Sequence, residues 1–268
     1  MSVRWMAICL LVTMITSCGG GKSNDEEAVM GAVESAPTNS VPDYILNAPD
    51  ADIEILLIGN SHSALEDFPL IIKNLVEAGT NQTVNSFNTN DWSYLSERSR
   101  ESGTTYDIVH SRNWTHVILQ GQMYSTSGNN TFPTTAAEEW VALLRDLDII
   151  PIMYPEHPRE NNFEEGQRVY DLHHTIAQSS NACVAPIGPA WDIAAEWYPD
   201  LSLHNEDGNH FNRRGAVLSA LVFYQVITEQ PANELRFVEG LGVREQLQTD
   251  LKRVVTDAVA LYPPCEYL

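Results

Sequence analysis

From residue 53 onward, short apolar segments alternate with longer amphipathic ones, and this alternation limits the chain to few folds. The apolar segments predict β-strands, and the amphipathic segments, with apolar residues every three or four positions, predict α-helices. Alternating strands and helices give right-handed crossovers, hence a parallel sheet with helices on both faces. We expect five strands, over 53–58, 83–87, 116–119, 149–154 and 182–187, and helices over 65–78, 133–147, 163–179, 189–198, 213–228 and 240–261.

The first eighteen residues resemble an export signal followed by a lipid-attachment site. Arg4 precedes a short apolar run over 7–15, and Thr16-Ser17-Cys18 follows. The run is far shorter than the roughly 20 residues of a membrane span. Its ending is similar to the bacterial lipobox, in which the signal is cleaved before a cysteine that then carries acyl chains. The alternative is a plain cleaved signal in which Cys18 has no special role.

These patterns divide the chain into three parts. Residues 1–17 are expected to be a lipoprotein signal peptide. Residues 18–47 begin with the lipidated cysteine and continue without apolar periodicity, which is typical of a flexible tether. Residues 48–268 are expected to form one domain, exported and membrane-anchored in a bacterial cell envelope.

The charge of the chain excludes some partners. The formal net charge is -21, from 36 acidic and 15 basic residues. A surface with this much negative charge repels phosphate backbones, and nucleic acid is therefore not an expected partner. Membrane contact is expected through Cys18 alone, because anionic lipid would also be repelled. The sequence contains neither a P-loop nor a dinucleotide fingerprint, and we expect no cofactor.

Two cysteines remain after the signal and the lipidated residue are set aside. Cys183 and Cys265 form an even pair in an oxidising compartment, which predicts a disulfide bond. The competing interpretation is a buried apolar Cys183 and a free thiol at Cys265. No metal is expected, because neither cysteine belongs to a Cys-x-x-Cys or Cys/His cluster.

A serine directly follows the first predicted strand, in Gly59-Asn60-Ser61. In open α/β sheets the functional site lies at the carboxyl ends of the strands. Backbone N–H groups at such a turn favour negative charge, so Ser61 is a candidate nucleophile. The alternative is a serine that only caps the next helix.

A second motif lies near the predicted helix over 213–228. Asp207 stands three residues before His210, in a turn. A carboxylate at that spacing can accept the imidazole Nδ1–H, which leaves Nε2 free to take a proton from a serine. Alone, the segment could equally be an ordinary capping turn with a surface histidine.

Together the two motifs resemble the SGNH (GDSL-like) hydrolase superfamily, over about residues 52–228. Its Gly-Asp-Ser-like block is similar to Gly59-Asn60-Ser61, and its Asp-x-x-His block to Asp207 to His210. The resemblance implies a flavodoxin-like three-layer sandwich and ester hydrolysis by a triad of Ser61, Asp207 and His210.

The two middle blocks of the superfamily are altered here. The loop after the second strand lacks the usual glycine, and Asn90 is expected to supply the backbone N–H that binds an oxyanion. The third block carries Gln122 where the superfamily has an asparagine, so its amide is expected to donate to the oxyanion, with Gln120 as second choice in another register. His62, Gln120 and Trp92 are expected near the pocket.

The resemblance and the export signal predict a serine esterase, whose substrate is a small acyl ester or an acylated glycan at the cell surface. Two alternatives stay open. The altered blocks could mark a non-catalytic module that only binds glycan, or the same triad could transfer acyl groups to a sugar.

The lipid anchor gives a first testable prediction. We expect Cys18→Ser to remove the protein from the membrane fraction, because the substituted residue cannot carry the acyl chains. Metabolic labelling with a fatty-acid analogue checks this, and labelling that persists in the variant would contradict the anchor.

Overall fold

The structure is a three-layer α/β sandwich around one parallel sheet. The computed structural model describes residues 41–89 and 91–268. The strands are β1 (Ile53–Ile58), β2 (Val84–Asn88), β3 (His116–Leu119), β4 (Ile150–Met153) and β5 (Cys183–Val184). All pairings are parallel, and the order is β2-β1-β3-β4-β5, as in flavodoxin-like folds. The predicted fold class and strand number are confirmed.

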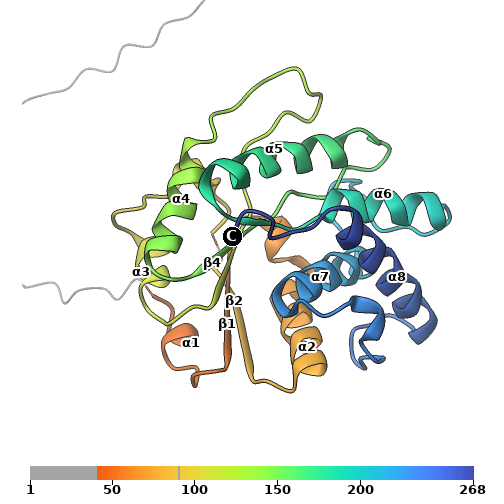
Figure 1. The fold of residues 1–268 in the computed structure, drawn as a ribbon, viewed down its shortest axis with the longest axis horizontal. Coiled ribbons are helices and arrows are strands. Elements are labelled where there is room, and N and C mark those ends of the chain that lie inside the picture. The colour runs from red at the N-terminus through yellow and green to blue at the C-terminus, as the bar shows by residue number, and fades with distance from the viewer. Residues whose placement is uncertain (1–40, 90) are drawn as a thin grey trace, which may run out of the picture. The chain divides into compact units, whose positions relative to one another are not determined.

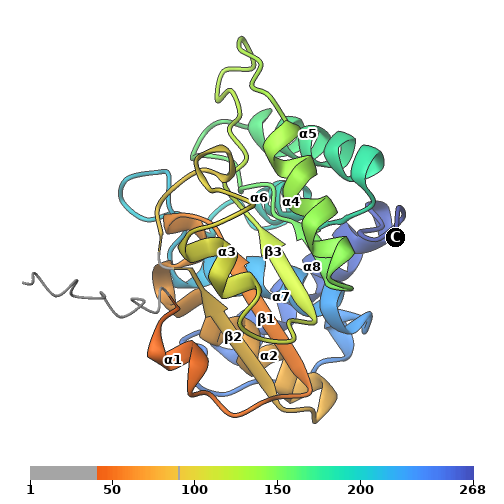
Figure 2. The ribbon, with the colours of Figure 1, turned by 90° about the vertical axis from the view of Figure 1, so that its left-hand side faces the viewer.

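Helices cover both faces of the sheet (Figure 1). One face carries α2 (Phe68–Thr80), α6 (Ile187–Trp197), α7 (Arg213–Thr228) and α8 (Glu245–Leu261). The other carries α1 (Asp43–Leu46), α3 (Thr104–Val109), α4 (Thr135–Asp146) and α5 (Glu165–Ser180). Figure 2 shows α3 and α4 in front of β1, β2 and β3.

The central strand β1 is hydrophobic because both of its faces are covered. Ile55 and Leu57 belong to the core under α2 and α7, whereas Leu56 and Ile58 belong to the core under α4 and α5. All four side chains are fully buried. This alternation fixes the register of β1, since a shift by one residue would exchange the two cores.

Some predicted boundaries were wrong. The helix expected from residue 65 begins at Phe68, after two short 3-10 turns, η1 (Ser61–Ser63) and η2 (Leu65–Asp67). The helix expected from residue 240 begins at Glu245, because Gly240 and Gly242 have positive φ values of 80° and 74°. The strand expected over 182–187 is limited to Cys183–Val184, since α6 begins at Ile187.

The boundary between tether and domain also needs correction. Residues 41–47 were expected to belong to the tether, but Val41 and Ile45 are buried in the core. Arg112 donates hydrogen bonds to the carbonyl oxygens of Ile45 and Ala48, both at 2.8 Å. The folded unit therefore begins before residue 48. The signal peptide, Cys18 and the tether up to residue 40 lie outside the described residues, and within those residues no helix is long and apolar enough to cross a membrane.

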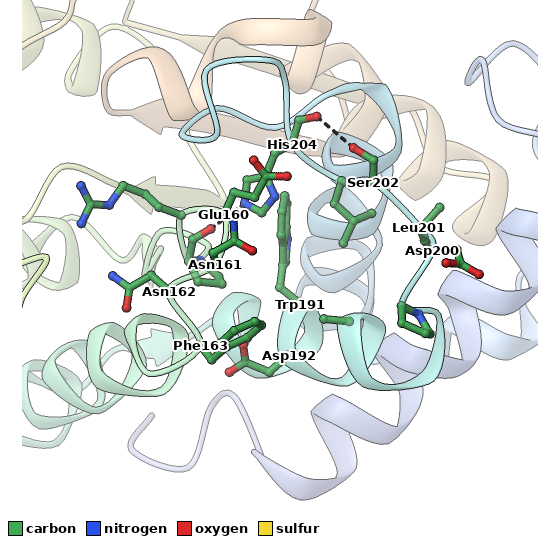
Figure 3. A pocket seen from close by; sticks show the side chains of 15 residues that line it. Glu160, Asn161, Asn162, Phe163, Trp191, Asp192, Asp200, Leu201, Ser202 and His204 are labelled. Atoms are coloured by element: carbon green, nitrogen blue, oxygen red, sulfur yellow. Dashed lines mark hydrogen bonds between the residues drawn. The ribbon is translucent and has the colours of Figure 1, made fainter.

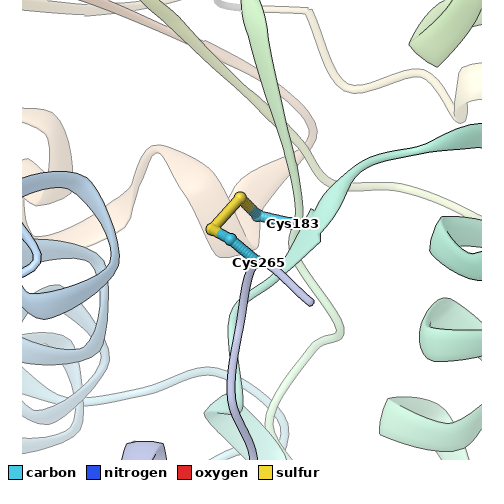
Figure 4. Close-up of a disulfide and its surroundings, with 2 residues drawn as sticks. All are labelled: Cys183 and Cys265. Atoms are coloured by element: carbon cyan, nitrogen blue, oxygen red, sulfur yellow. A yellow bond between two sulfur atoms is a disulfide. The ribbon is translucent and has the colours of Figure 1, made fainter. Parts of the chain in front are cut away.

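The C-terminal tail returns to the sheet edge. A disulfide joins Cys183 in β5 to Cys265 in the segment after α8 (Figure 4). The Val184 N–H donates to the Pro264 carbonyl oxygen at 2.7 Å. β5 is the last strand of the sheet, so the tail covers backbone groups that an edge strand would otherwise leave unpaired.

The disulfide closes a large loop, with a sequence separation of 82. We expect Cys183→Ala with Cys265→Ala to lower the free energy of unfolding by about 4 kcal/mol, because the open chain gains conformational entropy when unfolded. Urea unfolding of the two proteins measures the difference. Thiol counting on denatured protein is the control, and two free thiols from residues 183 and 265 would contradict the bond.

Candidate active site

The Gly59–Ser61 turn lies at the carboxyl end of β1, where the strand order reverses between β2 and β3. Its conformation is held by side chains. The Asn60 side chain accepts from the His62 N–H at 3.1 Å, and the Ser63 hydroxyl donates to the Asn60 carbonyl at 2.8 Å. Such a switch point is the usual ligand site of an open α/β sheet.

Glycine is required at position 59 by a close approach. A Cβ built there would lie 2.2 Å from Gln120 Oε1 and 2.6 Å from Ser63 Oγ, well inside contact distance. The Asn60 N–H donates to the same Gln120 oxygen at 2.6 Å. Gln120 is fully buried directly after β3, and its hydrogen bond to Asn60 holds the turn against the end of that strand.

His210 lies between Ser61 and Asp207. Its Nε2 is 2.8 Å from Ser61 Oγ, and its Nδ1 is 2.6 Å from Asp207 Oδ2. Asp207 also accepts the backbone N–H groups of Asn209 and His210, both at 3.0 Å. The imidazole and backbone donors hold the pKa of Asp207 below its usual range. An ionised Asp207 can only accept, so Nδ1 carries its proton and Nε2 accepts from the serine.

The structure therefore brings Ser61 into contact with His210, although the two residues are 149 positions apart in the sequence. The segment of Asp207 and His210 is anchored on both sides. The Asn205 N–H donates to the His210 carbonyl at 2.8 Å, and the Asn212 side chain caps α7 by accepting from Arg214 N–H at 2.9 Å.

A cavity of about 390 Å³ opens beside Ser61. Polar groups and aromatic or apolar side chains share its wall, so it suits a substrate that has both characters. Its lining residues are Asn60, Ser61, His62, Tyr94, Met123, Tyr124, Thr126, Phe132, Glu156, Asn209 and His210.

His62 lines the cavity, and its ring lies against the imidazole of His210. The two rings stack with centroids 4.8 Å apart and an interplanar angle of 25°. Burial lowers the pKa of His62, although the nearby Glu156 opposes the shift. A neutral His62 does not oppose a positive charge on His210, whereas two adjacent imidazolium rings would repel each other.

Glu156, which follows β4, joins the cavity wall to the nucleophile turn. Its carboxylate accepts from the Gln120 amide and, at 2.9 Å, from the Tyr124 hydroxyl. Burial, with the Glu156 charge beside it, raises the pKa of Tyr124, so the phenol remains a donor. Three hydrogen bonds, along the series Tyr124–Glu156–Gln120–Asn60, thus link the cavity wall to the turn that carries Ser61.

Arg98 holds the turn from the other side. Its guanidinium donates to the Gly59 carbonyl at 2.8 Å, and to the Asp91 and Ser93 carbonyls at 2.8 and 3.1 Å. It also forms an ion pair with Asp91 at 3.1 Å. Only 1% of the Arg98 side chain is exposed, so this one group fixes the loop after β2 relative to the serine.

The prediction for Gln122 does not agree with the structure. Its amide donates to the Met123 carbonyl at 2.9 Å and to the Pro133 carbonyl at 3.1 Å. The backbone has a positive φ of 99° at Gly121, and Gln122 is not among the residues that line the Ser61 cavity. Gln120 faces the turn but does not line the cavity either. Neither glutamine is placed to donate to an oxyanion.

Two other predicted residues have different outcomes. Asn90 lies outside the described residues. Trp92 is 64% exposed and is not part of the cavity wall, where Tyr94 stands instead. His62 is in the wall, as predicted.

The cavity residues that the sequence reasoning missed include three polar ones, Tyr124, Glu156 and Asn209. Glu156 carried a usable signal, since it follows β4 at the same sheet edge as Ser61. Tyr124 comes from the irregular segment 120–134, whose path has no periodic signal. Among the described residues, no group of three His, Cys, Asp or Glu side chains is arranged to hold a metal ion.

No family model matches the sequence, and no curated protein matches it. Solved structures do match. A DUF4886 family protein from Bacteroides uniformis superposes with a TM-score of 0.60 at 16% identity, over 79% of this chain and 95% of that one. A candidate SGNH hydrolase from Slackia heliotrinireducens superposes with a TM-score of 0.50 at 19% identity, over 65% and 98%. The chain has the SGNH-hydrolase fold.

Within this SGNH-hydrolase fold, the Ser61–His210–Asp207 arrangement can perform nucleophilic chemistry. His210 Nε2 is placed to remove the Ser61 proton as the oxygen attacks a carbonyl, and Asp207 stabilises the resulting imidazolium. The Ser61 backbone N–H has no hydrogen-bond partner among the residues described, so it is available to a developing oxyanion.

Arg98 should therefore affect the reactivity of Ser61 without touching the substrate. We expect Arg98→Lys to slow labelling of Ser61 by a fluorophosphonate probe roughly ten- to a hundredfold, because the three N–H donors of one ammonium nitrogen cannot reach the six oxygen atoms that the guanidinium binds, and the turn shifts.

Arg112 provides the matched control. It is also buried and bound to backbone carbonyls, but it lies beside Glu54 at the amino end of β1. Arg112→Lys should lower the free energy of unfolding and keep the labelling rate of the folded protein. Equal slowing in both variants would show that Arg98 only supports folding.

Proposed function

We propose that the protein is a serine hydrolase that cleaves carboxylic esters. The observation that carries this proposal is the continuous hydrogen-bonded series from Ser61 through His210 to Asp207. Ser61 attacks the ester carbonyl while His210 takes its proton, and His210 then gives a proton to the leaving alcohol. Water, activated by the same imidazole, releases the acid and regenerates Ser61.

The oxyanion is bound by groups other than the two glutamines. The Ser61 N–H is one donor, and the amide of Asn60, which lines the same cavity, is a second. The Asn60 oxygen already accepts from the His62 N–H, so its NH₂ group is the end left for a substrate.

The substrate we propose is a small acyl ester, such as an acetyl group on a glycan at the cell surface. Glu156 lines the cavity and Asp207 lies behind the His210 ring, and their negative charge disfavours an anionic acyl group. The mixed polar and aromatic wall favours a hydroxylated compound over a long aliphatic chain. We further propose that the lipid anchor at Cys18 keeps the protein in the cell envelope, where such glycans occur.

A panel of 4-nitrophenyl esters from acetyl to long acyl tests the activity. Ser61→Ala is expected to reduce ester hydrolysis to background, since the nucleophile is lost, and to leave the thermal unfolding midpoint nearly unchanged. Ser179→Ala is the matched control, because its hydroxyl bonds only to Ile176 O in α5, and it should keep full activity. A folded wild type that neither hydrolyses esters nor reacts with a fluorophosphonate would support a binding module instead.

A further inference from the structure

The structure has a second cavity, whose lining side chains are shown in Figure 3. Its volume is about 290 Å³, and its walls are the segment 158–163 after β4, one face of α6, and the segment 199–204. The Ser61 cavity shares none of these lining residues. It is therefore a separate space and needs its own explanation.

The two cavities are formed by neighbouring parts of the chain. Glu156 lines the first cavity and Pro158 the second, two residues later. The Glu160 N–H donates to the Gly208 carbonyl at 2.8 Å, so the second cavity backs directly onto the loop of Asp207 and His210. Between them His157 stacks on Trp191, with ring centroids 4.1 Å apart.

Asp192 gives this cavity a partly buried carboxylate acceptor. The carboxylate is partly buried against α5, where a Cβ on Gly166 would lie 2.9 Å from its Oδ2. Within the described part of the chain it has no hydrogen-bond or ion-pair partner. Burial raises the pKa of Asp192 to about 6. A ligand that donates a hydrogen bond would offset this desolvation.

Phe163 gives the same cavity an apolar surface. It is 79% exposed, the highest fraction among the large hydrophobic side chains that the structure describes as exposed. It lines the cavity together with Trp191, whose own ring is buried. An exposed aromatic ring at the edge of a polar cavity is suited to stack on a flat ligand.

We propose that this second cavity binds a neutral sugar ring of the glycan whose ester is cleaved at Ser61. A pyranose has an apolar C–H face for Phe163 and hydroxyl groups that donate to Asp192. Asn161 and Arg159, also in the wall, offer donors to the sugar oxygens. An organic cation is the competing ligand, because the carboxylates of Glu160, Asp192 and Asp200 would attract it; the sugar is favoured because only an oxygen-rich ligand can also accept the hydrogen bonds that Asn161 and Arg159 donate.

This inference rests on the proposed ester hydrolysis, but its test does not depend on catalysis. Unacylated xylotetraose, cellotetraose, mannotetraose and chitotetraose are titrated into the purified Ser61→Ala protein and followed by ligand-observed NMR, with choline as the cationic probe. We expect at least one oligosaccharide to bind and choline not to bind.

Two variants locate the binding. Phe163→Ala and Asp192→Asn, each in the Ser61→Ala background, should weaken binding roughly tenfold, the loss expected for one aromatic or polar contact. Phe237→Ala is the matched control: this ring is 41% exposed but lies outside the cavity, and binding should be unchanged.

The outcomes separate the two proposals. Loss of binding in both cavity variants, with Phe237→Ala unaffected, supports the sugar site whatever the esterase assay gives. Binding of choline alone, no oligosaccharide binding, or equal binding in all variants overturns it. Esterase activity without oligosaccharide binding leaves the hydrolase and removes only the sugar site.

Discussion

The site depends on the backbone of one turn at the end of the central strand. The turn from Gly59 to Ser61 leaves the sheet where both faces are covered, so its carbonyl and N–H groups need partners. Arg98 binds the Gly59 carbonyl and Gln120 binds the Asn60 N–H. With these neighbours paired inward, the Ser61 hydroxyl and N–H remain directed to the cavity. The orientation of the Ser61 hydroxyl thus depends on the hydrogen bonds that Gly59 and Asn60 make.

Much of this could be predicted from sequence, because the signals were local. The strands were predictable from apolar runs, and Ser61, Asp207 and His210 from their places next to a strand and a helix. The roles of Gln120 and Gln122 were not, because Gln120 is fixed by Asn60 and Glu156, while Gln122 is bound to the Pro133 carbonyl beyond the turn at Gly121. Arg98 and Glu156 act across chain separations of 39 and 36 residues, on Gly59 and Gln120. No spacing rule reports such pairings.

The few basic residues also explain the electrostatics of the molecule. Arg98 and Arg112 donate hydrogen bonds to backbone carbonyls inside the fold. The Lys252 ammonium likewise donates to the Leu235 and Arg236 carbonyls, at 2.9 Å. Their charges therefore reach the surface weakly, while most acidic side chains stay in solvent. The carboxylates of Glu54, Glu156 and Glu165 are buried as well, so the surface keeps the net negative charge of the chain, which disfavours anionic ligands.

The segments after β4 and α6 each contribute to both cavities at the sheet edge. Each contributes to the wall of the second cavity, and the continuation of each reaches the first, through Glu156 and through Asn209 and His210. Because the Glu160–Gly208 backbone hydrogen bond ties the two segments together, the second cavity cannot widen without moving the loop that carries His210. A ligand held there would restrict that loop. The proposed sugar site would therefore act on the geometry of the triad through this hydrogen bond.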